Sequence, residues 1–207
     1  SLVWRKVWRK VILYRNFTET LQKSDMKNFD FLHDINGFSK VHGFCCLCED
    51  YQVVDPRRSA QNGRLALEAM VKIIFYLKDW GVADKANLFE LTTDERFTTF
   101  IGDAEMMKRI HYIRKVGNNA SHAGDADVSR KESFFVLLNL FYFVSDILLT
   151  WHLIDEAPKF DKTLIPSNKE AVEQKITITP TKETEIQAAT DKSAEEAASA
   201  FNTSECP

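Results

Sequence analysis

The segment "FFVLLNLFYFVSDILLTWHLI", residues 134–154, is the longest apolar stretch of the chain. Asn139, Ser145, Asp146 and His152 interrupt it, so no uninterrupted apolar run reaches the ~18 residues that a membrane span needs. A long apolar segment with scattered polar positions is typical of a helix buried in a protein core. We therefore expect a core helix here and no membrane span.

The remainder of the sequence supports an all-α fold. Only seven glycines and five prolines interrupt 207 residues, whereas strand-rich folds need turn residues about every 8–12 positions. Apolar residues recur at helical spacing in four long segments, and a shorter polar segment carries capping residues. We expect an antiparallel helical bundle of four main helices plus a short one. The main helices are expected at 28–54, from Pro56 to a stop at Gly81, from Asp103 into the motif described below, and from Asp127 or Ser129 to about Leu153, with the short helix within 82–102.

Charge divides the chain into three parts. Residues 1–25 carry a net charge of +4 and residues 155–207 a net charge of −5, while the whole chain is at −3. This predicts a helical domain at 26–154 between a basic leader and an acidic tail, which we expect to be a disordered linker. The overall negative charge predicts no general attraction to nucleic acid.

The leader contains the tandem repeat "VWRKVWRK" at residues 3–10, which is a basic amphipathic helix by its spacing. Three interpretations remain open for residues 1–25: a helix for membrane surfaces or nucleic acid, a helix packed on the body, or non-native sequence ahead of a natural start at Met26.

The cysteines do not form a metal-site pattern. Cys45, Cys46 and Cys48 lie together on an apolar helical pattern, and Cys206 lies in the tail. A zinc site would need a second cluster of Cys or His at suitable spacing, and none follows. We expect buried, reduced thiols, no metal, no cofactor and a cytoplasmic location.

The segment "HYIRKVGNNASHAGD", residues 111–125, concentrates chemically versatile side chains. On one helix Arg114, Asn118 and His122 would follow each other at four-residue steps, within an arc of about 80°. A neutral histidine can move a proton, an arginine can hold a phosphate, and an asparagine can orient either. These three residues are the candidate catalytic set, and their chemistry suits metal-free cleavage of RNA.

The same segment is also typical of a helix junction. Gly117 and Gly124 bracket the polar residues, and asparagine and serine are common in turns and caps. A second polar pair, Arg64 and Glu68, lies four residues apart on an otherwise apolar helix. We expect this pair to form a structural network that anchors Arg114 or Asn118.

Three segments together carry a family resemblance. They are "NFDFL" at 28–32, "DPRRSAQNGRLALEAMVK" at 55–72 and "IRKVGNNASH" at 113–122. They resemble the domain of unknown function found at the amino-terminal end of many type I restriction enzyme R subunits. That domain is similar to the HEPN superfamily of all-helical bundles, several of which are metal-free ribonucleases. The resemblance covers roughly residues 26–153.

The resemblance implies a motif of arginine, a polar residue and a later histidine, often paired by dimerisation. Asn118 matches the polar residue and His122 the histidine, but Gly117 stands where the active nucleases carry arginine. Arg114 is the nearby substitute, and seven residues separate it from His122, a longer spacing than the family uses. The resemblance therefore favours a domain that does not cleave RNA.

From these observations we expect a non-catalytic HEPN-like module of a type I restriction-modification R subunit, active in phage defence through assembly or through nucleic-acid sensing and DNA binding. Its partners would be other restriction-modification subunits, the downstream nuclease and translocase domains, or nucleic acid. No phosphate-binding glycine loop is present, so the chain alone should not hydrolyse ATP. The alternatives are a metal-free HEPN ribonuclease acting as a homodimer and a plain helical protein-interaction module.

Overall fold

A computed structural model describes residues 26–81, 86–121 and 127–167, and within these ranges the all-α prediction is confirmed. The basic leader and residues 168–207 of the acidic tail lie outside the described residues. The first part of the tail, 155–167, is described and is not the disordered linker expected, because Phe160 and Ile165 pack against the core and Asp161 is hydrogen-bonded to Asn28. The described ranges contain no strand. The elements are η1 Asp30–Leu32, α2 Ser39–Tyr51, α3 Pro56–Leu77, α4 Leu88–Thr93, α5 Glu95–Ile101, α6 Ala104–Ser121, α7 Arg130–Thr150 and η2 Lys162–Leu164, where η marks a 3-10 helix.

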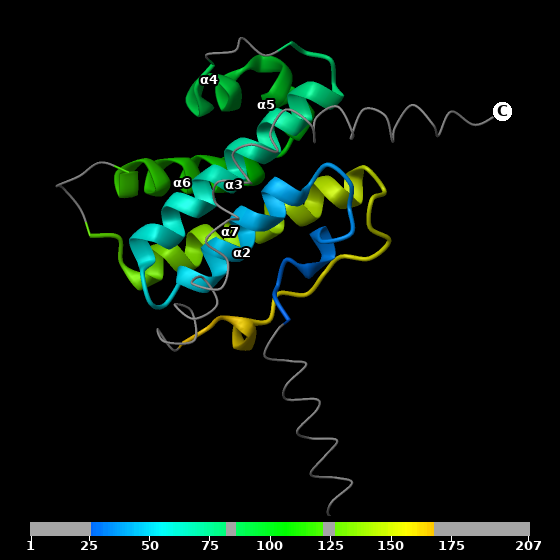
Figure 1. The fold of residues 1–207 in the computed structure, drawn as a ribbon. Helices are drawn as coiled ribbons and strands as arrows, with labels where there is room; N and C mark the ends of the chain where they lie inside the picture. Colours follow the sequence, from blue (N-terminus) through cyan, green and yellow to red (C-terminus); the bar gives the residue numbers. More distant parts are fainter. Residues whose placement is uncertain (1–25, 82–85, 122–126, 168–207) are drawn as a thin grey trace, which may run out of the picture.

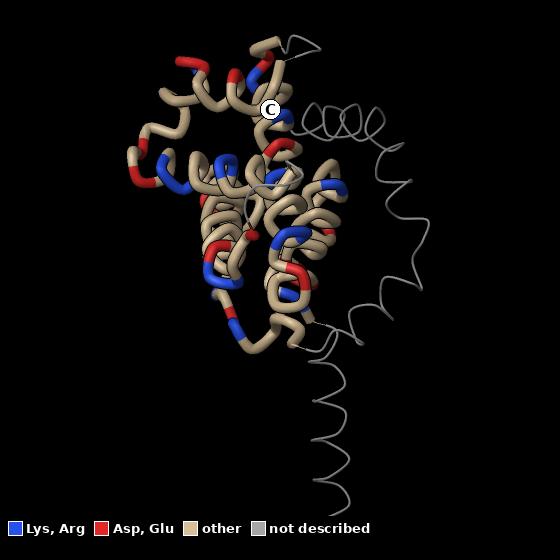
Figure 2. The backbone as a smooth tube through the Cα atoms, turned by 90° about the vertical axis from the view of Figure 1, so that its left-hand side faces the viewer, with Lys and Arg blue, Asp and Glu red and all other residues tan. Residues whose placement is uncertain are grey.

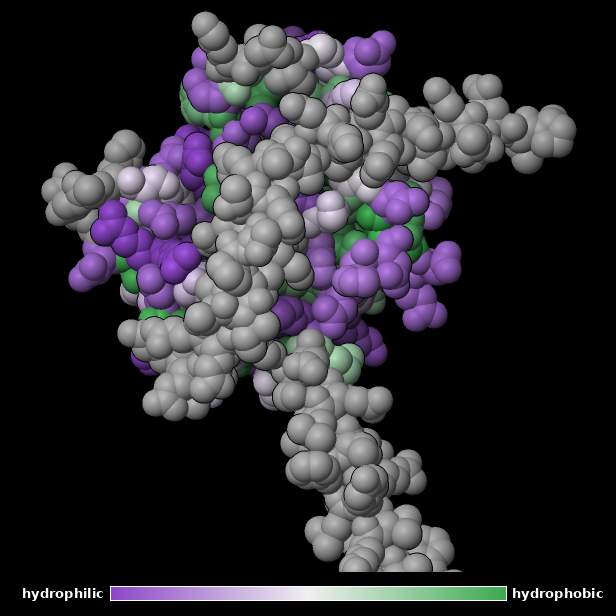
Figure 3. Space-filling view, in the orientation of Figure 1, coloured by the Kyte–Doolittle hydropathy of each residue, from purple (hydrophilic) through white to green (hydrophobic). Residues whose placement is uncertain are grey.

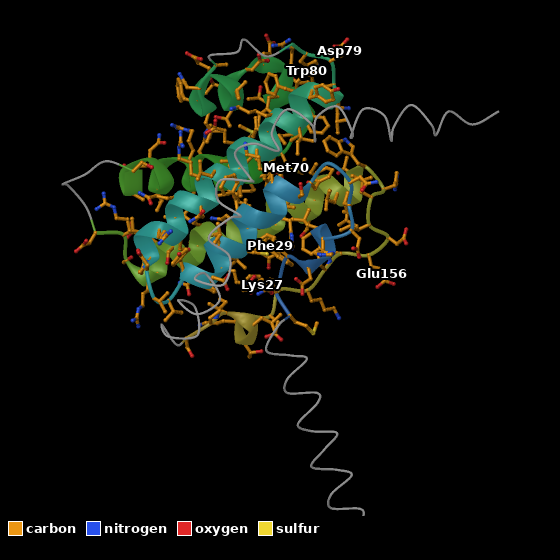
Figure 4. The ribbon with its side chains drawn as sticks, in the orientation of Figure 1. Lys27, Phe29, Met70, Asp79, Trp80 and Glu156 are labelled. Carbon is orange, nitrogen blue, oxygen red and sulfur yellow. The ribbon has the colours of Figure 1, made fainter. Side chains whose placement is uncertain are left out.

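The long helix α3 lies at the centre of the body and packs against α2, α6 and α7 (Figure 1). Pro56 occupies its first turn, and the Asp55 side chain accepts a hydrogen bond from the Arg58 N–H at 3.0 Å. This is the usual chemistry of a helix start, because proline lacks the N–H that would go unpaired there. Met70, near the middle of the molecule in Figure 4, is fully buried.

Helix α7 is the core helix predicted from the apolar stretch. Ser129 and Glu132 form a reciprocal capping box at its start, so Ser129, and not Asp127, is the cap. Its length and composition would allow it to cross a membrane, but 56% of the apolar window is buried within the protein. A core helix of this composition meets the same criteria, so the prediction of no membrane span stays a prediction.

Two helices end earlier than expected, at left-handed residues that are not glycine. Asp79 has a φ of 51°, and the Trp80 N–H donates to the Phe75 carbonyl at 3.0 Å. His152 has a φ of 55° and ends α7 in the same way. The stop predicted at Gly81 was therefore two residues late, because the αL position that closes such a C-terminus is taken by an aspartate.

Two other boundaries also differ from the expectation. The helix expected from residue 28 begins only at Ser39, because Gly37 has a φ of 83° and separates η1 from α2. The single short helix expected within 82–102 is a pair, α4 and α5, since Asp94 leaves helical geometry with a ψ of 132° and caps α5. This pair lies at one end of the molecule (Figure 1).

On the face shown in Figure 3, the described residues that are visible are mostly hydrophilic, with smaller hydrophobic patches between them. Lys and Arg positions recur along the helices of the body, with Asp and Glu positions between them (Figure 2). By sequence, α3 and α6 each hold four Lys or Arg residues and one Glu. The basic charge of the described body is therefore concentrated on two helices that pack against each other.

Candidate functional site

The candidate motif lies at the carboxyl end of α6, which continues unbroken to Ser121. Arg114 and Asn118 are therefore on one helix, one turn apart, and Gly117 is buried inside that helix instead of forming a turn. His122 lies outside the described residues, so its position relative to Arg114 and Asn118 stays a prediction. The motif is thus a helix face, at least as far as Ser121.

At Gly117 the helices α6 and α3 lie in close contact. A Cβ atom added to Gly117 would lie 2.4 Å from Cβ of Arg64 and 3.0 Å from the carbonyl oxygen of Ala60. Real Cβ atoms do not approach other atoms so closely, and the Ala60 oxygen is backbone that cannot rotate away. Any side chain at position 117 would force the two helices apart.

The same contact joins the two polar pairs predicted from the sequence. Nε of Arg64 donates a 2.6 Å hydrogen bond to Oδ1 of Asn118. Glu68 lies 3.6 Å from the Arg64 guanidinium and 2.9 Å from the ammonium of Lys72. Arg64 and Glu68 are each about one quarter exposed, so this network lies at the partly exposed edge of the interface between α3 and α6. It links α3 to Asn118, one of the candidate residues.

The carboxyl end of α6 is also held by side chains of α3. Nε of Arg57 and Nε2 of Gln61 both donate to the Ala120 carbonyl oxygen, each at 2.8 Å. The last carbonyl groups of a helix commonly lack intrahelical partners, and these two bonds supply side-chain donors for one of them. Sequence reasoning missed Arg57 and Gln61, although both precede Arg64 at helical spacing on the same helix.

Arg114 faces a different neighbour, the short helix α4. Its guanidinium lies 4.9 Å from the ring centroid of Phe89, a cation–π contact. Among the described residues, the buried Nε of Arg114 and the buried Nδ1 of His111 have no hydrogen-bond partner. Desolvation and the nearby charge of Arg114 lower the pKa of His111. A neutral imidazole therefore lies beside an arginine with unused donors, on the α4 side of α6.

The cysteines of α2 are free thiols, and the described residues hold no group of His, Cys, Asp and Glu suited to a metal ion. Cys45 and Cys48 are buried, and Cys46 lies 3.3 Å from Nε2 of His42. Burial raises the pKa of Cys46 and of Cys48 to about 12. Thiols with such pKa values remain protonated at neutral pH and are poor nucleophiles.

Glu49 has a strongly shifted pKa that the sequence did not suggest. It is fully buried on α2, and desolvation raises its pKa to about 7 despite hydrogen bonds from Asn28. Its carboxylate accepts from the Asn28 backbone N–H and side-chain amide, and that amide exchanges hydrogen bonds with the backbone of Asp161. Lys27 and Asp50 form an ion pair beside it. Glu49 therefore binds Asn28 near the start of the described chain, and Asn28 in turn binds Asp161 near its end.

The Arg64–Asn118 bond can be measured by a double-mutant cycle of Arg64→Ala and Asn118→Ala. We expect a coupling of about 1 kcal/mol in the free energy of unfolding, because either substitution removes the hydrogen bond between a charged donor and a half-buried acceptor. Urea unfolding of the two single variants and the double variant gives the coupling. A cycle of Arg64→Ala with Asn119→Ala, an exposed neighbour on α6, is the control with no expected coupling. A coupling of zero in the Asn118 cycle would show that the bond does not stabilise the fold.

Glu49 predicts a specific dependence of stability on pH. Its pKa in the folded protein, about 7, is above the ordinary value of 4.5, so folding favours the protonated acid. The contribution of Glu49 to stability is therefore present below pH 4.5 and is lost as the pH rises towards 7. We expect Glu49→Gln to gain stability relative to the parent between pH 5 and pH 8, by on the order of 3 kcal/mol. Urea unfolding of both proteins across this range tests it, and a difference that does not change with pH would contradict it.

Searches with models of known protein families, against curated proteins and against solved structures found no match to this chain. The family suggested by the three sequence segments therefore remains an expectation.

Proposed function

We propose that this chain is a non-catalytic HEPN-like helical module of a type I restriction-modification R subunit, acting in phage defence through assembly or nucleic-acid sensing. The resemblance of three sequence segments, described above, supplies the family. The all-α fold is compatible with it. The observation that carries the non-catalytic part of the proposal is the close contact at Gly117.

Gly117 occupies the position where the resemblance implies arginine in active nucleases. In this chain that position has no room for a side chain, because Arg64 and the Ala60 carbonyl fill the space. The neighbouring Asn118 accepts a hydrogen bond from Arg64, so one of its acceptor sites is used to join two helices. The motif residues that the structure describes at 117 and 118 thus serve packing, which supports a structural or binding role.

A basic pair of helices supports contact with nucleic acid. Four Lys or Arg residues on α3 and four on α6, each set against a single Glu, contrast with a chain that is negative overall. A local excess of positive charge attracts phosphate groups without any need for base recognition. Partner subunits of the same system and the downstream nuclease and translocase domains are the other proposed partners, in the cytoplasm.

One observation favours the metal-free ribonuclease as a second candidate. Arg114 stands on the same helix as His111, and each has a buried ring or guanidinium nitrogen without a described partner. A neutral imidazole beside an arginine could move a proton while the guanidinium holds a phosphate. In a homodimer, a second copy would supply the remaining groups of the site.

Incubation of the purified chain with labelled single-stranded RNA, without metal ions, separates the two candidates. We expect no cleavage by the parent, by His111→Ala, by His122→Ala or by Arg114→Ala, because position 117 offers no catalytic side chain. Lys115→Ala, which changes an exposed cation beside Arg114, is the matched control. Cleavage by the parent and by Lys115→Ala that is lost in Arg114→Ala and in at least one of the two histidine variants, with all five proteins folded, would establish the ribonuclease instead.

A further inference from the structure

A surface groove lies between the end of α3 and α5, away from the motif. This shallow, open groove has a volume of about 530 Å³ and is lined by Lys78, Trp80, Glu95, Arg96, Thr99 and Phe100. Lys78 lies 14 residues beyond Arg64, which corresponds to about 21 Å along a helix axis. The groove is thus separate from the α3–α6 contact at Gly117.

The aromatic wall of the groove is fixed by the way α3 ends. The left-handed Asp79 turns the chain, and the Trp80 N–H closes the helix on the Phe75 carbonyl at 3.0 Å. The indole then packs edge-on against Phe75 at 5.2 Å and against Phe100 at 6.1 Å between ring centroids. Figure 4 places Asp79 and Trp80 at this end of the molecule. The rings are held in place before any ligand arrives.

The two cations of the groove, Arg96 and Lys78, differ in their partners. Arg96 donates from Nε and Nη2 to the Asp94 carboxylate and from Nη1 to the Trp80 carbonyl, so its charge is balanced and its position fixed. These hydrogen bonds hold the pKa of Asp94 at about 2. Lys78 has its ammonium 4.8 Å from the Phe100 ring centroid, with no acidic partner among the described residues. Lys78 is therefore the cation that a ligand can use.

We propose that this groove binds a nucleotide, with the phosphate at Lys78 and the base on the part of the Trp80 and Phe100 rings that is not covered by the Arg96 guanidinium over Trp80 and the Lys78 ammonium over Phe100. Aromatic side chains stack on any base, and a nearby cation binds the phosphate. The Glu95 carboxylate, which also lines the groove, repels a simple anion but accepts hydrogen bonds from a sugar hydroxyl or a base amino group. A purely apolar ligand would leave Lys78 and Glu95 unused. The nucleotide is either free or part of a single strand.

The test follows the tryptophan indole N–H signals of the full chain by NMR during titration with AMP. Trp80→Phe assigns the Trp80 signal and keeps an aromatic ring in the groove. We expect AMP to shift the Trp80 signal, and Lys78→Gln to weaken binding about fivefold or more. Lys72→Gln, an exposed lysine of α3 outside the groove, should bind AMP as the parent does. No shift of the Trp80 signal at millimolar AMP, or equal binding by Lys78→Gln, would overturn the proposal.

A parallel titration with a ten-residue single-stranded oligoadenylate identifies the source of the nucleotide. Binding at least tenfold tighter than that of AMP, with the same loss in Lys78→Gln, supports the groove as a site for single strands. Equal binding per site supports a site for free nucleotides. An acidic peptide that shifts the Trp80 signal where AMP does not would assign the groove to a protein partner and overturn the proposal. The RNA-cleavage result does not decide this proposal, because Arg114 does not line the groove.

Discussion

The fold depends on how closely three helices approach α3, and two glycines set that distance. A Cβ at Gly63 of α3 would lie 2.4 Å from a methyl group of Val136 on α7 and 3.2 Å from the sulfur of Cys48 on α2. Gly117 sets the same limit where α6 meets α3. Because interiors are packed without spare volume, one added methyl group at either contact has to move a helix or a neighbouring side chain. These two glycines therefore let α2, α6 and α7 pack closely against α3.

The contact at Gly117 also determines what the polar motif can do. The helices are close enough there for Arg64 to reach Asn118, and for Arg57 and Gln61 to reach the last carbonyl groups of α6. Asn118, a catalytic candidate by its sequence spacing, thereby helps to hold α3 and α6 together. Arg114 is different, since it points to Phe89 of α4 and keeps an unpaired nitrogen. The motif thus joins α6 to α3 through Asn118 and to α4 through Arg114, whose buried Nε has no hydrogen-bond partner among the described residues.

Much of the fold could be predicted because helix periodicity is a local property. The four long helices and the cap at Ser129 were all visible in the spacing of apolar and capping residues. The boundaries that were wrong depend on single backbone angles, at Gly37 and Asp79, which sequence constrains only weakly. The network at Glu49 was not predictable, because it joins residues 28 and 161, which are 133 positions apart. Gly117 was visible as an unusual residue, but its role requires knowing which helix lies against it.

The most direct test of the account is the stability of Gly117→Ala, measured by urea unfolding with Asn119→Ala, an exposed position of the same helix, as the control. Alanine is favoured over glycine inside a helix by about 1 kcal/mol when nothing opposes it. The close contact predicts the opposite sign, a loss of about 1–3 kcal/mol, because the added Cβ overlaps Arg64 and the Ala60 carbonyl. A gain in stability for Gly117→Ala would contradict the claim that the α3–α6 contact excludes a side chain at this position.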